Sequence, residues 1–250
     1  MKKVLSILLA IICVISFTVT AFAEDTVIPS ESVVTNEDVE GTEAQEDPEN
    51  PEEPAEPDEP VEPAKTFDVT MYICATANSL TGHVWLYFVN NSNVPVKVGY
   101  VDLTPGAGIS VGSLRNSRKD GGGTYYNGEA MMAEKDGKLE SLKDHTYSLK
   151  MSLTKEQLET VNEKIKSKNA YEMIFYNCGV FATSVWNSVS DKKVVHIVLP
   201  IFTILNMTIL GAKKGELLMQ NPTESEIFKQ TDSGCRIADE KSFNMSCVNF

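Results

Sequence analysis

The chain has 250 residues, of which 35 are acidic and 22 are basic, and its formal net charge is −13. Sixteen of the acidic residues and seven of the 11 prolines lie between Glu24 and Thr66. Without that stretch and the lysines Lys2 and Lys3, 19 acidic residues balance 19 basic ones, so no basic surface for nucleic acid is expected.

The first 23 residues have the pattern of a secretory signal peptide. Lys2 and Lys3 precede an apolar run that ends in Ala21-Phe22-Ala23, an A-x-A cleavage site. An uncleaved membrane anchor is the alternative, because the apolar run is nearly long enough to span a bilayer. The pattern predicts a secreted or extracellular protein, for which a bacterial cell envelope is one location, with no stable membrane span after cleavage.

Residues 24–65 form a second segment that is not expected to fold. Stretches such as "EDPENPEEPAEPDEPVEPAK" cannot bury enough apolar area to offset the entropy of ordering, and their charges repel one another. We predict a disordered, extended, acidic linker here.

Residues 66–250 are enough for one domain with a full core. Cysteines lie at positions 74, 178, 235 and 247 of this stretch, and Cys235 and Cys247 could form a disulfide in an oxidising location. The spacings of Cys and His match no zinc site, so no metal or cofactor is expected.

Hydrophobic alternation predicts a series of strands in the first half of this domain. A half-buried strand starts at Thr66, and residues 82–90 form a second one that is rich in aromatic and branched side chains. A third strand over 94–103 is expected to pair with the second as a hairpin. Further strands are expected within the loop 104–114, in a glycine-led hairpin over 121–133, and over 146–153.

Helical patterns follow in the second half. Thr154 with Gln157 forms a capping box at the start of a helix. Residues 194–211 are strongly apolar and are interpreted as a buried strand and a core helix, with a second membrane span as the alternative. This order of elements predicts an α+β fold, an antiparallel sheet with packed helices.

One short stretch, "YNCGVFATSVWNSV", has the chemistry of a nucleophile. Asn177 is a good N-cap, which places Cys178 at the first position of a helix. The helix dipole and the unpaired N–H groups there favour thiolate over thiol. A buried structural cysteine is the competing interpretation, because cysteine is among the most buried residue types.

The domain has three histidines that could serve as a base for this thiol. His83 begins the second strand, His145 lies in a polar turn, and His196 lies in an apolar run. A Cys–His pair needs the imidazole within hydrogen-bond reach of sulfur, and a strand-borne base can meet a helix-borne nucleophile on rigid elements. His83 is therefore the predicted base.

The motifs "TGHVWLYFVNNSN" and "YNCGVFATSVWN" together resemble the circularly permuted branch of the NlpC-type, papain-like superfamily, which includes lecithin:retinol acyltransferase-like proteins. The resemblance covers about residues 70–190. It implies a papain-like α+β fold with Cys178 as nucleophile and His83 as base. The matching residues are Gly82, His83, Tyr87, Asn177, Cys178 and Phe181.

Sites of this kind usually carry a third polar residue that orients the histidine. If "NNSN" is a four-residue turn, Val89 pairs with Val94, and His83 then faces Tyr100 with Asp102 on the diagonal. Asp102 is the better acceptor and Tyr100 the nearer one. The predicted catalytic residues are Cys178, His83 and Asp102.

Two further polar residues, Asn127 and Glu129, either line a cleft or belong to a surface hairpin. The resemblance implies a thiol hydrolase that cleaves peptide or amide bonds, with cell-wall peptidoglycan as the expected substrate class. The alternatives are a non-catalytic, secreted or surface-displayed binding module with the same fold, and a thioester acyltransferase. The oligomeric state is left open by the sequence.

Overall fold

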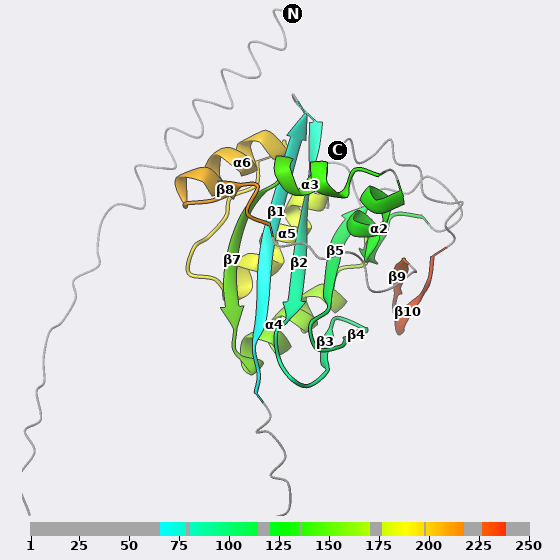
Figure 1. Ribbon diagram of the computed structural model, residues 1–250. Coiled ribbons are helices and arrows are strands. Elements are labelled where there is room, and N and C mark those ends of the chain that lie inside the picture. Colours follow the sequence, from blue (N-terminus) through cyan, green and yellow to red (C-terminus); the bar gives the residue numbers. More distant parts are fainter. Residues whose placement is uncertain are drawn as a thin grey trace, which may run out of the picture. The chain divides into compact units, whose positions relative to one another are not determined.

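The computed structural model describes residues 66–78, 81–114, 121–135, 137–170, 177–197, 199–217 and 227–238 (Figure 1). The predicted signal peptide over 1–23 and the predicted linker over 24–65 lie outside these residues.

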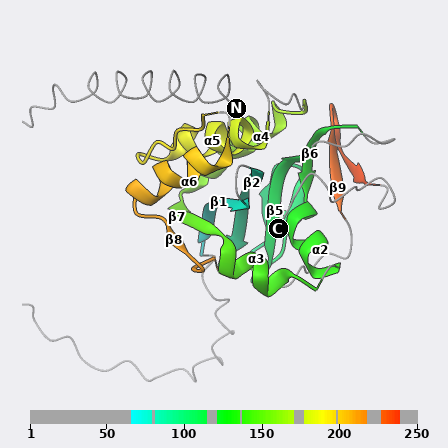
Figure 2. The same cartoon turned by 90° about the horizontal axis from the view of Figure 1, so that it is seen from above.

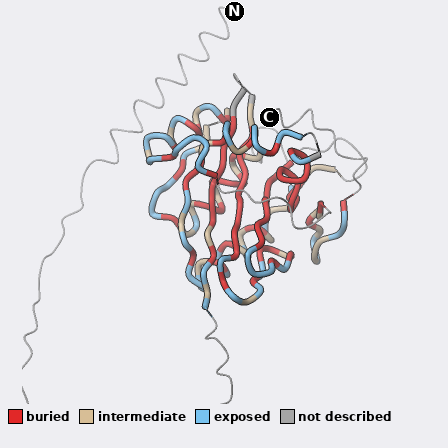
Figure 3. The backbone as a smooth tube through the Cα atoms, viewed as in Figure 1, coloured by how far each residue is buried: buried red, intermediate tan, exposed pale blue. Residues whose placement is uncertain are grey.

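The domain is built on an eight-stranded antiparallel sheet in the order β10-β9-β6-β5-β2-β1-β7-β8, and a separate two-stranded sheet is formed by β3 and β4. The long central strands β1, β2 and β5 are mostly buried (Figure 3). The strands are β1 (Val69–Asn78), β2 (Thr81–Asn90), β3 (Val96–Val98), β4 (Val101–Leu103), β5 (Gly108–Leu114), β6 (Gly123–Tyr126), β7 (Tyr147–Leu153), β8 (Lys213–Lys214), β9 (Phe228–Thr231) and β10 (Gly234–Ile237).

Helices cover both faces of the large sheet. Because side chains alternate along a strand, Met71 and Ile73 of β1 pack in one core with α4, α5 and α6, whereas Tyr72 and Cys74 pack in another with α2 and α3. Figure 2 shows the two helical layers on opposite sides of the sheet. The helices are α2 (Gly128–Lys135), α3 (Leu139–His145), α4 (Lys155–Lys166), α5 (Cys178–Val189) and α6 (Pro200–Ile209).

The α+β class, with five helices on an antiparallel sheet, is as predicted. The strands near 66–77, 82–90 and 146–153 are confirmed, and so is the capping box that starts α4. The Gln157 backbone N–H donates to the Thr154 hydroxyl at 3.2 Å, and the Thr154 N–H donates to the Gln157 side chain at 2.9 Å.

The predicted pairing of residues 94–103 with the second strand is wrong. β2 pairs with β1 on one side and with β5 on the other, so no edge is left for a third partner. The buried side chain of Asn90 donates to the carbonyls of Val94 and Leu103, each at 2.9 Å. These two hydrogen bonds hold both ends of the 94–103 segment next to Asn90. β3 and β4 therefore form a hairpin of their own.

The strand predicted over 121–133 forms only in its first part, and a helix replaces its second part. β6 ends at Tyr126, Asn127 takes a left-handed turn with φ 62°, and α2 begins at Gly128. The short helix α3 and the β9–β10 hairpin were not predicted.

In the apolar run 194–211 the described residues, 194–197 and 199–211, form a single helix of ten residues, and the buried strand expected there is absent from them. Within the described residues, no helix has the length and apolar character needed to cross a membrane.

Candidate active site

The first helical residue of α5 is Cys178, as the sequence predicts. Asn177 is the N-cap, and its side-chain oxygen accepts a hydrogen bond from the Val180 N–H at 3.0 Å. Phe181, Ala182 and Val185 on the inner side of α5 are buried in the core. The helix is thus fixed against the sheet, and its N-terminus holds the thiol in place.

His83, in β2, lies near this thiol, at a place where β2 is no longer paired with β5. The β2–β5 ladder runs from Val89 paired with Gly108 to Leu86 paired with Val111, and the described pairing ends there. His83 lies beyond the end of that ladder, is 2% exposed, and is close enough to Cys178 for each group to shift the pKa of the other. The helix-borne thiol and the strand-borne imidazole are therefore neighbours.

A third residue, Glu129 of α2, completes the group. Its Oε1 lies 2.8 Å from Nε2 of His83, and its side chain is fully buried. Because Nε2 faces Glu129, the nitrogen left for Cys178 is Nδ1. A buried carboxylate is costly unless it has a partner, and the imidazolium is that partner.

Two neighbours shape the space around His83. Trp85 stacks on the imidazole with ring centroids 5.5 Å apart and an interplanar angle of 10°. Gly112 of β5 leaves room for the carboxylate, because a Cβ there would overlap Glu129 and lie 3.3 Å from Nε2 of His83. The His83 ring is therefore held on its face by an aromatic side chain and at its edge by an acid.

The electrostatics of the group favour a thiolate–imidazolium pair. Burial opposes the charged imidazole, but Cys178 and Glu129 outweigh it and raise the pKa of His83 from 6.5 to about 10. Burial also opposes the thiolate, but His83 and the backbone N–H groups of Val84 and Gly179 lower the pKa of Cys178 below its ordinary value. The thiol is thus prepared for nucleophilic attack.

The residues predicted to orient His83 lie elsewhere. Asp102 is in β4 with a side chain that is 73% exposed, and it pairs with Lys97 at 3.3 Å. The Tyr100 ring lies under the Lys166 ammonium, 5.2 Å from its centroid. The predicted register that would place Asp102 and Tyr100 opposite His83 does not form. The 94–103 segment pairs only with itself, and His83 pairs with Thr76 of β1.

The sequence alone indicates only that Glu129 lines a cleft or belongs to a surface hairpin. It is separated from His83 by 46 positions, and the strands β3, β4, β5 and β6 lie between them in the chain. One local signal was available: Glu129 is the only charged residue in the otherwise apolar or small stretch "GEAMMA". A buried acid at the start of a helix is uncommon unless it is paired.

The other histidines and thiols do not join the group. His145 is exposed at the end of α3, with Nδ1 2.8 Å from the Ser141 carbonyl. His196 packs its ring against Gly179 and bonds Thr203 at 2.6 Å. Cys235 carries no disulfide, and Cys247, its suggested partner, lies outside the described residues.

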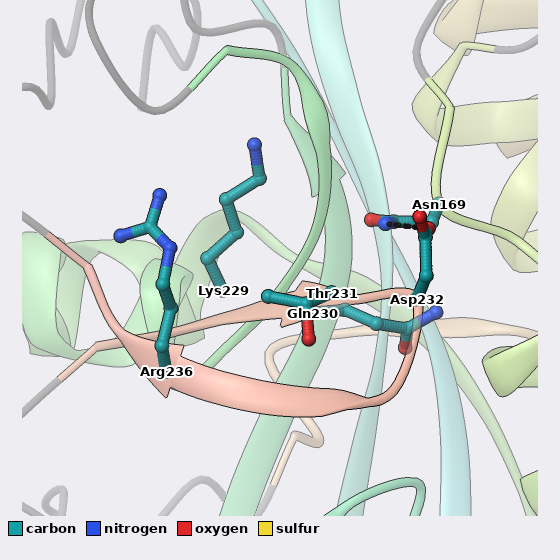
Figure 4. Close-up of a pocket in the computed structure, with 6 residues that line it drawn as sticks. All are labelled: Asn169, Lys229, Gln230, Thr231, Asp232 and Arg236. Carbon is teal, nitrogen blue, oxygen red and sulfur yellow. Dashed lines mark hydrogen bonds between the residues drawn. The ribbon is translucent and has the colours of Figure 1, made fainter.

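A polar hollow lies at the β9–β10 end of the sheet (Figure 4). Lys229 and Arg236 stand opposite each other on the two strands there. None of the residues that line the hollow belongs to the Cys178 group. They are Asn169, Lys229, Gln230, Thr231, Asp232 and Arg236.

Comparison of this chain with protein-family models, with curated proteins and with solved structures found no match. The chemistry of the site is therefore the basis for assigning a function.

Proposed function

We propose that this chain is a thiol hydrolase that cleaves peptide or amide bonds, with Cys178 as nucleophile, His83 as base and acid, and Glu129 as the residue that orients His83. The observation that carries the proposal is the proximity of these three side chains, from a helix, a strand and a second helix, in one group whose imidazole and carboxylate are buried and whose thiol is partly exposed. A structural cysteine requires neither a buried imidazole nor a buried carboxylate behind it.

The negative charge of the Cys178 thiolate and the positive charge of the His83 imidazolium determine the steps of the reaction. The Cys178 thiolate attacks the substrate carbonyl, a C–S bond forms, and the carbonyl oxygen gains negative charge. The Val84 and Gly179 N–H groups already face the sulfur and provide donors beside the developing charge. The His83 imidazolium then donates its proton to the leaving nitrogen as the C–N bond breaks, which leaves a thioester on Cys178.

Water completes the cycle. His83, now neutral, takes a proton from a water molecule, and the resulting hydroxide attacks the thioester and releases the acid and the thiolate. Glu129 keeps Nε2 paired throughout and so fixes the ring with Nδ1 toward sulfur. An acyltransferase would follow the same first half and differ only in its acceptor.

The arrangement of elements supports the finer assignment to a papain-like, permuted NlpC-type fold. A thiol at the start of a helix packs against an antiparallel sheet whose strand carries the histidine, and the histidine precedes the cysteine along the chain. Together with the predicted secretion, this favours a peptide of the cell wall as substrate. The binding-module alternative is based on the lack of an orienting residue and on the acidic linker, and Glu129 answers the first of these two grounds.

The test is digestion of purified peptidoglycan by the wild-type chain and by Cys178→Ala. We expect new amino and carboxyl termini from the wild type, detected by mass spectrometry of the released fragments, and none from the variant. Equal release by both proteins would contradict the proposal. Labelling of Cys178 by a peptidyl electrophile, with no release from peptidoglycan, would retain the thiol chemistry but reject this substrate class.

A further inference from the structure

The outer face of α6 exposes an apolar stripe. Ile201, Leu205 and Ile209 are 37%, 59% and 76% exposed, and their four-residue spacing places them along one side of the helix. Val195, 49% exposed, lies beside them, since its N–H donates to Asn206 of α6. Among the described residues, only Ile237 is a further exposed large apolar side chain. Single exposed residues are ordinary, but a cluster marks an interaction surface.

This stripe belongs to a well-anchored helix. The opposite side of α6 is buried through Pro200, Thr203, Ile204 and Met207. The helix ends in a Schellman motif, in which the Gly211 N–H donates to the Thr208 carbonyl and the Ala212 N–H to the Met207 carbonyl. The apolar side chains are therefore held outward by a rigid element.

Lysines gather at the same end of α6 as Ile209, the most exposed member of the stripe. The Lys192 ammonium lies 3.3 Å from the Leu210 carbonyl, and Lys213 and Lys214 follow the helix directly, both exposed. Lys193 adjoins Lys192 in sequence and is exposed too.

The acidic residues of this neighbourhood are Asp144, whose backbone lies beside Gly215, together with Asp191 and Glu216, and Glu216 pairs with Lys213 at 2.9 Å. Four lysines against three acids leave the surroundings of the stripe positive by one charge, on a chain whose net charge is −13. The charge at this end of α6 is thus opposite in sign to that of the whole protein.

We propose that this basic apolar patch, made of Val195, Ile201, Leu205, Ile209 and the four lysines 192, 193, 213 and 214, binds the surface of an anionic lipid bilayer. The apolar side chains enter the boundary between headgroups and acyl chains, and the lysines meet the lipid phosphates. Ten residues of helix cannot span a bilayer, so the contact is superficial. A second copy of the chain would cover the stripe but would offer its four lysines only three acids, Asp144, Asp191 and Glu216.

The test is cosedimentation of the chain from Glu24 onward with vesicles of phosphatidylcholine, alone or mixed with phosphatidylglycerol. We expect binding that requires phosphatidylglycerol and weakens with added salt. Leu205→Ser with Ile209→Ser is expected to lower the partition constant about tenfold or more, because two apolar side chains no longer leave water. Replacing Lys192, Lys213 and Lys214 by Gln is expected to remove the preference for anionic vesicles.

Ile237→Ser is the matched control, because Ile237 is equally apolar, 54% exposed and remote in sequence from α6. Its binding is expected to equal that of the wild type. The proposal is overturned if the wild type does not bind anionic vesicles, or if the α6 double variant binds as well as Ile237→Ser. Dimerisation that depends on Leu205, without vesicle binding, also overturns it. None of the substituted residues belongs to the group of Cys178, His83 and Glu129. The labelling rate of Cys178 is therefore a separate readout that reports on the proposed hydrolase alone.

Discussion

Oε1 of Glu129 lies 2.8 Å from Nε2 of His83, and both side chains are buried between the sheet and α2. This pair fixes which nitrogen of the imidazole faces Cys178. It also makes Glu129, rather than Asp102, the residue on which the behaviour of His83 depends.

Glu129→Gln tests that dependence. The amide keeps the shape of the side chain but removes the charge that favours the imidazolium, so the pKa of His83 is expected to fall from about 10. The Cys178 pKa is expected to rise in turn, because its cationic partner is lost over part of the pH range. The rate of Cys178 alkylation at neutral pH is therefore expected to fall.

Asp102→Asn is the matched control for this substitution. Asp102 is an exposed acid that pairs with Lys97 away from the site, and surface pairs of this kind contribute little. Its alkylation rate is expected to equal that of the wild type. If Asp102→Asn lowers the rate and Glu129→Gln does not, the assignment of the orienting residue is wrong.

The pH dependence of hydrolysis is expected to be a broad bell. The reaction needs deprotonated Cys178 and protonated His83. The acidic limb therefore follows the lowered pKa of Cys178, and the alkaline limb follows the loss of the His83 proton near pH 10. His83→Ala is expected to reduce turnover about 10²- to 10⁴-fold, the usual contribution of a general acid–base group. A rate that keeps rising with pH through 10 would show that the imidazolium is not required.

Gly112→Ala tests the packing behind His83. The added methyl group overlaps the Glu129 carboxylate, so either the acid or β5 must move. We expect a loss of about 1–3 kcal/mol in the free energy of unfolding, together with slower alkylation of Cys178. Gly234→Ala is the control, because a Cβ there meets nothing within 4 Å. Wild-type reactivity in Gly112→Ala would mean that the His83–Glu129 contact is dispensable.

Asn177→Ala tests the helix start that holds the thiol. The loss of the cap to the Val180 N–H is expected to cost about 1 kcal/mol in unfolding free energy, measured by denaturant titration. Asn177→Ser keeps an oxygen acceptor and is expected to retain most of that stability. If alanine and serine are equivalent, the cap does not hold the N-terminus of α5.

The sequence was sufficient to single out Cys178 and His83, which the fold brings together, because each has a local signature. Asn177 before Cys178 is an N-cap pattern, and His83 opens a strand with clear alternation. Their proximity was predicted because a strand-borne imidazole can meet a helix-borne thiol, and the resemblance implied the same pair. The third residue required knowledge of how β5, β6 and α2 return to His83, which is long-range topology that no local pattern encodes.

The mistaken choice of Asp102 has a definite physical cause. The turn residues after Asn90 suggested a tight hairpin, which is the commonest connection between neighbouring strands. The buried Asn90 side chain instead bonds the carbonyls of Val94 and Leu103 and closes a loop, and β5 takes the place beside β2. An asparagine whose side chain bonds the carbonyls of its own loop cannot be told apart, by sequence, from an asparagine in a turn.

The measurement that tests the central claim most directly is titration of the thiolate by ultraviolet absorbance, taken as the difference between the wild type and Cys178→Ala. Cys74 and Cys235 have raised pKa values, mainly through burial, and are common to both proteins. The account predicts a difference signal that titrates clearly below the ordinary thiol pKa of about 8.5 and moves upward in His83→Ala. A signal that titrates at or above that value, and that His83→Ala leaves unchanged, would contradict the thiolate–imidazolium pair.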